Sequence, residues 1–211
     1  MVLPDCVLLP GETLPLYIFE PRYRRMLEDV LEGSRSFCVA RRRLDLPSEE
    51  PEEVACLGFV TVAVKQEDGT SHLQIQGSAR VRLTEAMHDH PYPYFDLTLL
   101  ESKPTPREAC QKDLDRMHAL LRGRLDSGIE AALETLNSSQ ECSQPLAKTR
   151  RQLEDGAAAL VAEIENEADA GRAVDRTAAT LLCDPDHRQE VLTEVDVAKR
   201  VRLLNTLLNW G

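Results

Sequence analysis

The sequence predicts an α+β protein, with a small β-barrel in residues 1–103 and an α-helical bundle in residues 104–211. The first observation behind this prediction is a series of short strand-like segments, separated by turn residues and corner glycines, up to about residue 101. The second is a change of period at Lys103, after which apolar residues recur every three or four positions, as in helices. A closed or half-closed barrel with one internal helix, followed by a bundle, satisfies both observations.

The barrel half opens with two apolar segments around a turn. Residues 6–9 form a short apolar run, expected to be a strand, that ends at Pro10-Gly11, where proline presets φ and glycine accepts a positive φ. Residues 14–19 are rich in β-forming residues and are expected to be a second, heavily buried strand. Pro21 suits the first position of a helix, with Glu20 as a weak cap, so residues 21–32 are expected to be helical.

Turn and bulge residues delimit the other strands. Asp68-Gly69 is a hairpin turn signal between two strand-like segments. Gly77 should interrupt the second hairpin strand as a bulge or corner. The strands expected after the helix cover residues 36–41, 57–64, 73–76, 79–83 and 95–100.

The second half is expected to contain helices and no strand over residues 106–209. Thr105 and Glu108 have the spacing of a capping box, and an apolar stripe follows at Cys110, Leu114, Met117, Leu121 and Leu125. A separate helical stretch is expected at residues 129–136, and another helix between Pro145 and Ile164. Two final helices should begin at Asp184-Pro185 and at Asp196.

Three segments of the chain resemble the N-terminal domain of Lon proteases. The most specific is residues 9–27, where an apolar segment, a Pro-Gly turn and a second apolar segment lead through Phe19-Glu20-Pro21-Arg22-Tyr23 into a helix. Residues 77–83 are similar to the family's Gly-x-x-Arg strand, and residues 180–204 to its closing helices. The resemblance implies a PUA-like barrel of the Lon N-terminal type, here free-standing, without the ATPase and peptidase domains.

The resemblance also implies a function: a non-catalytic module that binds unfolded or partly folded protein segments through apolar contacts and edge-strand hydrogen bonds. A full-length protease is a further candidate partner. The peptide-binding hypothesis places the ligand at Tyr17, Phe19, Glu20, Arg22 and Tyr23. For the last three residues we favour a structural interpretation over the ligand-binding one, with Glu20 and Arg22 tying the helix to the barrel and Tyr23 packing in the core.

Charge and composition limit the kinds of partner and the cellular compartment to be expected. Asp and Glu outnumber Lys and Arg by 36 to 25, and the net charge of −11 repels phosphate backbones, so nucleic acid is not an expected partner. No apolar run approaches the roughly 20 residues of a membrane span, and no signal-peptide pattern follows Met1. The six cysteines form no C-x-x-C pair, which indicates reduced thiols. We expect a cytoplasmic protein with no membrane partner.

The sequence carries no recognisable catalytic motif. Gly123 and Gly128 have the glycine spacing of a P-loop, but Ile129 and Glu130 stand where a Lys and a Ser or Thr would hold phosphate and Mg²⁺. The five lysines lie in polar surroundings, and none is paired with a recognisable nucleophile in the manner of Lon's Ser-Lys peptidase site. We therefore expect neither enzymatic activity nor a cofactor.

Two polar clusters are candidate ligand sites. His88-Asp89-His90 places histidines at alternate positions but has no evident third ligand, so we expect a loop and no metal site. Arg41-Arg42-Arg43 could bind phosphate, as in the PUA-type RNA-binding barrels that the Lon domain resembles, but acidic residues up to Glu53 follow, and a solvated loop is expected. A PUA-type nucleic-acid-binding protein and a small-ligand sensor are the alternative functions. The client and the oligomeric state are not specified by the sequence.

Overall fold

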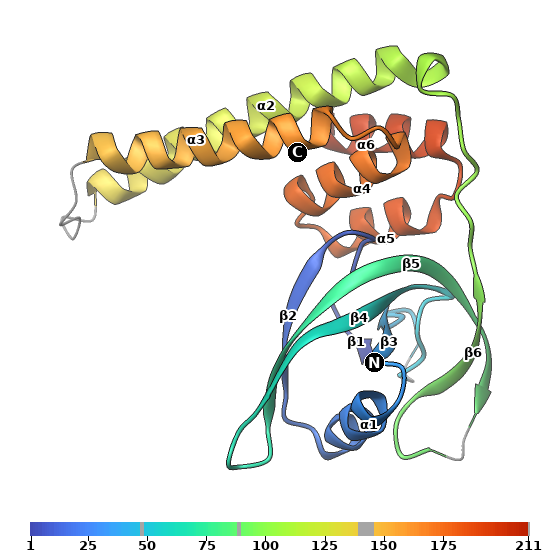
Figure 1. The fold of residues 1–211 in the computed structure, drawn as a ribbon. Helices are drawn as coiled ribbons and strands as arrows, with labels where there is room; N and C mark the ends of the chain where they lie inside the picture. Colours follow the sequence, from blue (N-terminus) through green and yellow to red (C-terminus); the bar gives the residue numbers. More distant parts are fainter. Residues whose placement is uncertain (47–48, 88–89, 139–145, 211) are drawn as a thin grey trace. The chain divides into compact units, whose positions relative to one another are not determined.

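A computed structural model describes residues 1–46, 49–87, 90–138 and 146–210 of the chain (Figure 1). The fold contains two compact units. The barrel unit consists of Met1–Lys103 and Leu182–Asp196, and the helical unit consists of Pro104–Leu181 and Val197–Gly211. Strands followed by helices confirm the predicted α+β class.

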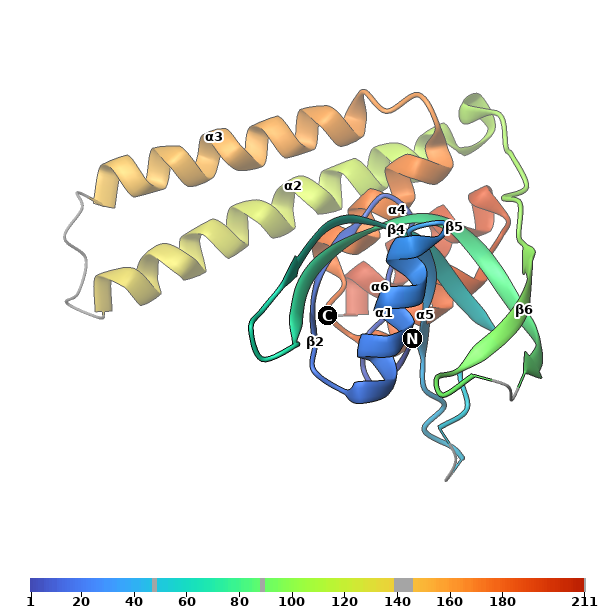
Figure 2. The ribbon, with the colours of Figure 1, turned by 60° about the horizontal axis from the view of Figure 1, so that its bottom comes forward.

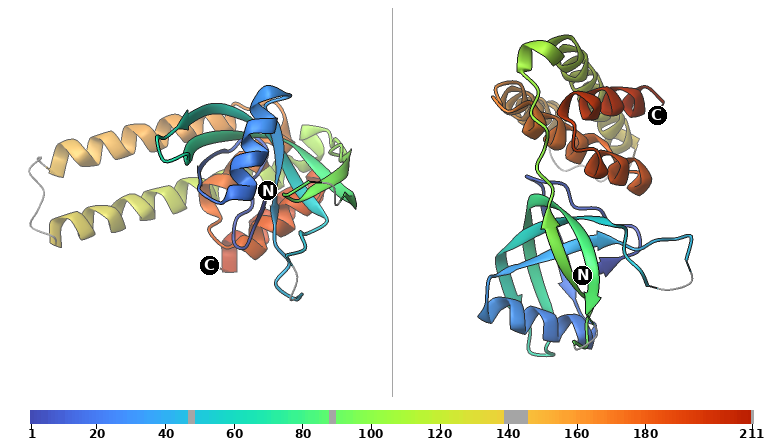
Figure 3. Two further views of the ribbon diagram at one scale, coloured as in Figure 1. Left: turned by 90° about the horizontal axis from the view of Figure 1, so that it is seen from below. Right: turned by 90° about the vertical axis from the view of Figure 1, so that its right-hand side faces the viewer.

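The barrel unit is built on a six-stranded sheet that curls on itself, with helix α1 across one end (Figure 3). Its strands are β1 (Val2–Leu3), β2 (Thr13–Ile18), β3 (Ser36–Arg41), β4 (Val54–Lys65), β5 (Ser71–Met87) and β6 (Tyr94–Leu99). The order is β1-β3-β4-β5-β2, β6 also pairs with β5, and only the β1–β3 pair is parallel. Helix α1 (Pro21–Glu32) has the predicted bounds, although the Glu20 side chain makes no capping hydrogen bond.

Strand β5 pairs with β4 along one edge and with two other strands in succession along the opposite edge, and it is interrupted at the predicted bulge. Its first part pairs with β2 and its second part with β6. The register with β4 moves from Leu57 opposite Ala79 to Gly58 opposite Gly77, so one residue of β5 is extra, as expected for a bulge. A Cβ atom on Gly77 would lie 2.2 Å from the carbonyl oxygen of Leu9, which explains the glycine. The expected pair of strands at residues 73–76 and 79–83 is one strand, since pairing continues across the bulge.

The expectation of a strand at residues 6–9 was wrong. This segment is buried but irregular, because it bonds to a side chain instead of a neighbouring strand. The carbonyl of Val7 accepts hydrogen bonds from the guanidinium of Arg188 at 2.8 and 3.1 Å. The turn that follows does have the expected positive φ, 84° at Gly11. The expectation that β2 is heavily buried was also wrong, since alternate side chains of β2 face solvent.

The helical unit contains α2 (Arg107–Ser138), α3 (Leu146–Glu165), α4 (Ala170–Leu181) and α6 (Val197–Trp210), and α2 and α3 run side by side (Figure 2). The predicted stripe on α2 is confirmed for Cys110, Leu114, Met117 and Leu121, which are at most 1 % exposed, whereas Leu125 is only partly buried. Residues 129–136 are not a separate helix, since α2 continues through Gly123 and Gly128 without a break. In the described parts of 106–209 no residue lies in a strand, and Asp196 forms only an isolated bridge with Lys103.

Helix α5 (Pro185–Thr193) belongs to the barrel unit, which differs from the predicted domain 104–211. Asp184 caps it as expected, accepting from the N–H of Asp186. The guanidinium of Arg80 on β5 donates to the carbonyl of Leu192 at 2.9 Å, and the amide of Gln189 donates to the carbonyl of Val54 at 3.0 Å. These bonds join residues more than 100 positions apart, which local sequence patterns do not reveal. Across the described residues, no helix has the length and apolar character needed to cross a bilayer.

Candidate functional site

Large apolar side chains lie exposed on the outer side of β2, β5 and β4. The strand register places Tyr17 in one row with His72 and Val64, and Pro15 in the next row with Gln74 and Val62. We call this surface the apolar face, and it consists of Pro15, Tyr17, Phe59, Val62, Val64, His72, Gln74 and, directly after β2, Phe19. Its five large apolar side chains are 46–57 % exposed. Contiguous exposed apolar surface of this kind marks interaction sites.

The apolar face is both hollowed and ordered. A depression of about 400 Å³ lies between Pro15, Tyr17, Val62 and Val64. The Tyr17 ring stacks on His72 and on Phe19, with centroid distances of 4.8 and 5.9 Å. Stacked rings lose little further freedom on binding, and aromatic side chains supply much of the affinity in protein interfaces.

A bulge in β4 enlarges the apolar face. The register moves from Val60 opposite Ile75 to Val62 opposite Gln74, so Thr61 is an extra residue. Phe59 and Val62 are three positions apart, so regular alternation along β4 would point them to opposite sides of the sheet, and the bulge brings them to the same side. No residue of the face is an Asp, Glu, Lys or Arg. The surface therefore suits apolar, uncharged groups.

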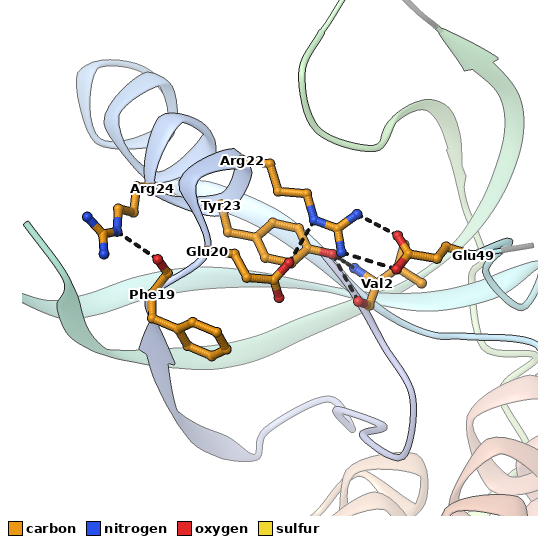
Figure 4. A network of polar contacts seen from close by, with 7 residues as sticks. All are labelled: Val2, Phe19, Glu20, Arg22, Tyr23, Arg24 and Glu49. Atoms are coloured by element: carbon orange, nitrogen blue, oxygen red, sulfur yellow. Dashed lines mark hydrogen bonds and ion pairs between the residues drawn. The ribbon is translucent and has the colours of Figure 1, made fainter.

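Glu20, Arg22 and Tyr23 form a polar network next to the apolar face (Figure 4). The Arg22 guanidinium donates to Glu20 at 2.9 Å and to Glu49, and it lies 4.7 Å from the centre of the Tyr23 ring. The hydrogen bonds from Arg22 hold the pKa of the Glu49 carboxyl below its usual range. This network ties the start of α1 to the loop that precedes β4.

Tyr23 itself is only 3 % exposed. Its hydroxyl donates to the carbonyl of Val2 at 3.0 Å and accepts from the N–H of Val2 at 3.2 Å, and burial raises the pKa of the phenol. The ring has no surface to offer a ligand. The five residues of the site hypothesis are thus divided: Tyr17 and Phe19 lie on the apolar face, while the other three make contacts within the barrel unit.

The family of the ATP-dependent protease La (LON) substrate-binding domain matches residues 1–210. The chain belongs to this family. It is 24 % identical to Lon protease 2 of Herpetosiphon aurantiacus and 20 % identical to the Lon protease of Desulfosudis oleivorans. Each alignment covers 99 % of this chain but only 23 % of the relative, so the chain spans less than a quarter of the length of these proteases.

Solved Lon N-terminal domains have the same fold. The N-terminal domain of the Mycobacterium avium complex Lon protease superposes with a TM-score of 0.63 at 16 % identity. The Lon N-terminal domain protein of Xanthomonas campestris gives 0.59 at 20 % identity. Both superpositions cover 99 % of this chain and 96 % of the other. The resemblance inferred from the opening motif is confirmed, and the family is that of Lon's substrate-binding domain rather than its catalytic one.

The Arg41-Arg42-Arg43 run does not form a basic patch in this chain. Arg41 ends β3, is 6 % exposed and pairs with Asp186 at 2.6 Å, so the expectation of a fully solvated loop was wrong there. Arg43 pairs with Asp45 at 2.7 Å. Two of the three cations are therefore neutralised by carboxylates.

The other polar motifs also lack the geometry of a site. Gly123 and Gly128, with P-loop spacing, lie inside helix α2 and not on a loop. His88 and Asp89 lie outside the described residues, and the ring of His90 packs 4.4 Å from that of Tyr94. Among the residues that the structure describes, no group of three His, Cys, Asp or Glu could hold a metal ion.

The sequence pattern missed Phe59, Val62, Val64 and His72 as members of the site. The signal was present in residues 57–64, which are apolar on both faces of the strand. Such a run predicts a strand buried on both sides, and here one of its sides faces solvent.

The small-ligand sensor alternative requires a pocket in which several polar groups converge on the ligand. A second cavity of about 270 Å³ in the barrel unit is instead lined mainly by apolar side chains such as Met26, Phe37 and Leu83.

Proposed function

We propose that this chain is a non-catalytic module that binds apolar segments of unfolded or partly folded proteins on the apolar face. The observation that carries the proposal is the uncharged, exposed cluster around Tyr17, which a protein that binds nothing would be expected to cover. Membership of a substrate-binding domain family supports the same assignment. Binding involves no covalent step. A full-length protease that receives the bound segment is part of this proposal, as is a cytoplasmic location.

The expected affinity is micromolar or weaker, about −8 kcal/mol at best, because a single module must order a flexible ligand. The test is a titration of the purified chain with a fluorescently labelled, reduced and carboxymethylated unfolded protein. Apolar contacts should survive a change from low to high salt, whereas contacts to phosphates weaken steeply. No binding at either salt concentration would end the proposal, and salt-sensitive binding of RNA alone would support the PUA-type alternative.

A matched pair of variants locates the binding surface. Tyr17→Ser combined with Phe19→Ser should weaken binding at least about tenfold, since each ring contributes about 1 kcal/mol or more when a ligand covers its exposed half. Leu99→Ser is the control, because Leu99 on β6 is 59 % exposed, close to the 57 % of Phe19, but lies outside the apolar face. Equal losses for the two variants would mean that the apolar face is not the site.

Two activity assays test whether the chain is non-catalytic. The purified chain should neither hydrolyse ATP nor cleave casein, because the chain has no P-loop lysine and no Ser-Lys pair. Fluorescently labelled casein and a phosphate-release assay are sufficient for both measurements. Turnover above that of a buffer blank in either assay would contradict the proposal.

A further inference from the structure

Strand β2 has a free edge beside the apolar face. It is the last strand in the sheet order and, among the residues that the structure describes, pairs only with β5 (Figure 1). The N–H of Gly77 donates to the carbonyl of Glu12 at 2.8 Å, which fixes the side on which that carbonyl lies. Because main-chain groups alternate along a strand, the carbonyls and N–H groups of Thr13, Pro15 and Tyr17 point away from β5.

Pro15 agrees with this assignment. A proline has no N–H, and within a sheet it is tolerated where that N–H would face the open edge. The free edge therefore offers two donors, the N–H groups of Thr13 and Tyr17, and three acceptors, the carbonyls of Thr13, Pro15 and Tyr17. No described residue bonds to any of them. The edge ends at Phe19, whose carbonyl accepts from the guanidinium of Arg24 at 2.8 Å.

We infer that the bound polypeptide is an extended strand added to the free edge of β2. This inference rests on the proposed function and specifies its ligand. The five free groups recur at every second residue, about 6.8 Å apart, which matches the main chain of an extended peptide. Alternate side chains of such a strand lie beside Pro15 and Tyr17 on the apolar face. The ligand class is thus an extended segment with apolar residues at every second position.

Pro15 has a second consequence for the edge. An open strand edge is a template for pairing with any other chain, including a second copy of the same protein, and an edge proline limits this by removing one donor. Pro15 lies in the middle of the three outward-facing residues, so the edge accepts a strand with one hydrogen bond fewer. Restoring that donor should strengthen strand addition.

The decisive ligands are three nine-residue peptides with alternating valine and threonine and a lysine at each end. One is unmodified, one is N-methylated at its valines, and one is N-methylated at its threonines. In an added strand only alternate N–H groups face the edge. One methylated peptide should therefore bind at least tenfold more weakly than the unmodified peptide, while the other should bind within about twofold of it. Equal effects of the two methylation patterns overturn the inference.

Two variants complete the test. Pro15→Val restores an N–H at the edge and should raise the affinity for the unmodified peptide about two- to tenfold, the effect of one net hydrogen bond. Gln74→Val, the control, adds apolar surface in the same row but no main-chain donor. If Gln74→Val raises the affinity for the unmodified peptide as much as Pro15→Val does, the inference is overturned. It is also overturned if Pro15→Val does not raise this affinity although sedimentation shows that the variant is a monomer.

The two proposals fail in different ways. If the unfolded protein binds and the Tyr17 and Phe19 variant weakens it, but the methylated peptides behave alike, strand addition is wrong and the apolar face remains the binding site. If neither the unfolded protein nor the unmodified peptide binds, both proposals are wrong.

Discussion

Replacing Tyr23 by phenylalanine separates the two interpretations of Glu20, Arg22 and Tyr23, because it removes one oxygen atom from the barrel unit. That oxygen makes two hydrogen bonds with the main chain of Val2, at 3.0 and 3.2 Å, in a residue that is 3 % exposed. A buried hydrogen bond contributes about 0.5–1.5 kcal/mol net. The loss of two should therefore lower the free energy of unfolding by about 1–3 kcal/mol.

Urea unfolding followed by circular dichroism measures this loss, and hydrogen exchange of peptides from β1 and α1 assigns it to the barrel unit. Tyr17→Phe is the matched control, because the Tyr17 ring is half exposed, and its effect should stay within about 0.5 kcal/mol. Binding of the unfolded protein should be unchanged by Tyr23→Phe. A stability loss below about 0.5 kcal/mol, or a binding loss as large as that of the Tyr17 and Phe19 variant, would refute the structural interpretation.

Three further predictions concern stability. In urea unfolding, Leu121→Ala should lower the free energy of unfolding by about 2–5 kcal/mol, and Met117→Leu by less than about 1.5 kcal/mol. A loss below about 0.5 kcal/mol for Leu121→Ala would mean that the stripe on α2 is not part of a core. Gly77→Ala should lower the stability in thermal unfolding, because its Cβ would lie 2.2 Å from a carbonyl oxygen. Gly128→Ala, where a Cβ on α2 meets open space, should raise the stability by up to about 1 kcal/mol. The opposite order of the two variants would contradict the described packing. Burial and a hydrogen bond to a carboxylate raise the pKa of Tyr92 to about 12. Its unfolded value is about 10, so the folded state holds the proton more tightly, and stability should fall as the pH rises from about 10 to 12. Tyr92→Phe should show less of this fall, and an identical pH profile would be inconsistent with the raised pKa.

Local patterns in the sequence predicted the elements that local forces determine. Helix α1 has its predicted bounds because Pro21 and the apolar spacing act within the segment. The bulge at Gly77 was predicted because glycine marks close backbone approach. Helix α4 was missed because its buried side consists largely of small residues, with Ala173 and Ala178 among them, and not of the leucines and methionines that marked the other helices. Residues 6–9 were assigned wrongly because their main chain bonds to Arg188, far along the chain.

The candidate site was predicted in part. Tyr17 and Phe19 were proposed from the opening motif, and the structure places both on the apolar face. Phe59 and Val62 could not be added from the sequence, because they are three positions apart and share a side of the sheet only where the bulge at Thr61 breaks the alternation of β4. A bulge in the middle of an apolar strand leaves no periodic signal, since both faces of the strand carry apolar residues.

The assignment of helix α5 to the barrel unit has a consequence for synthesis on the ribosome. The chain leaves this unit after Lys103, returns at Leu182 and leaves again after Asp196. The strands of the barrel are therefore translated long before helix α5, and the hydrogen bond from the Arg80 guanidinium to the carbonyl of Leu192 can form only after Leu192 has been synthesised. We expect nascent chains that end before residue 182 to carry an incomplete barrel, sensitive to protease. A fragment intended to contain the binding surface alone should keep Leu182–Asp196, joined to residue 103 by a designed linker.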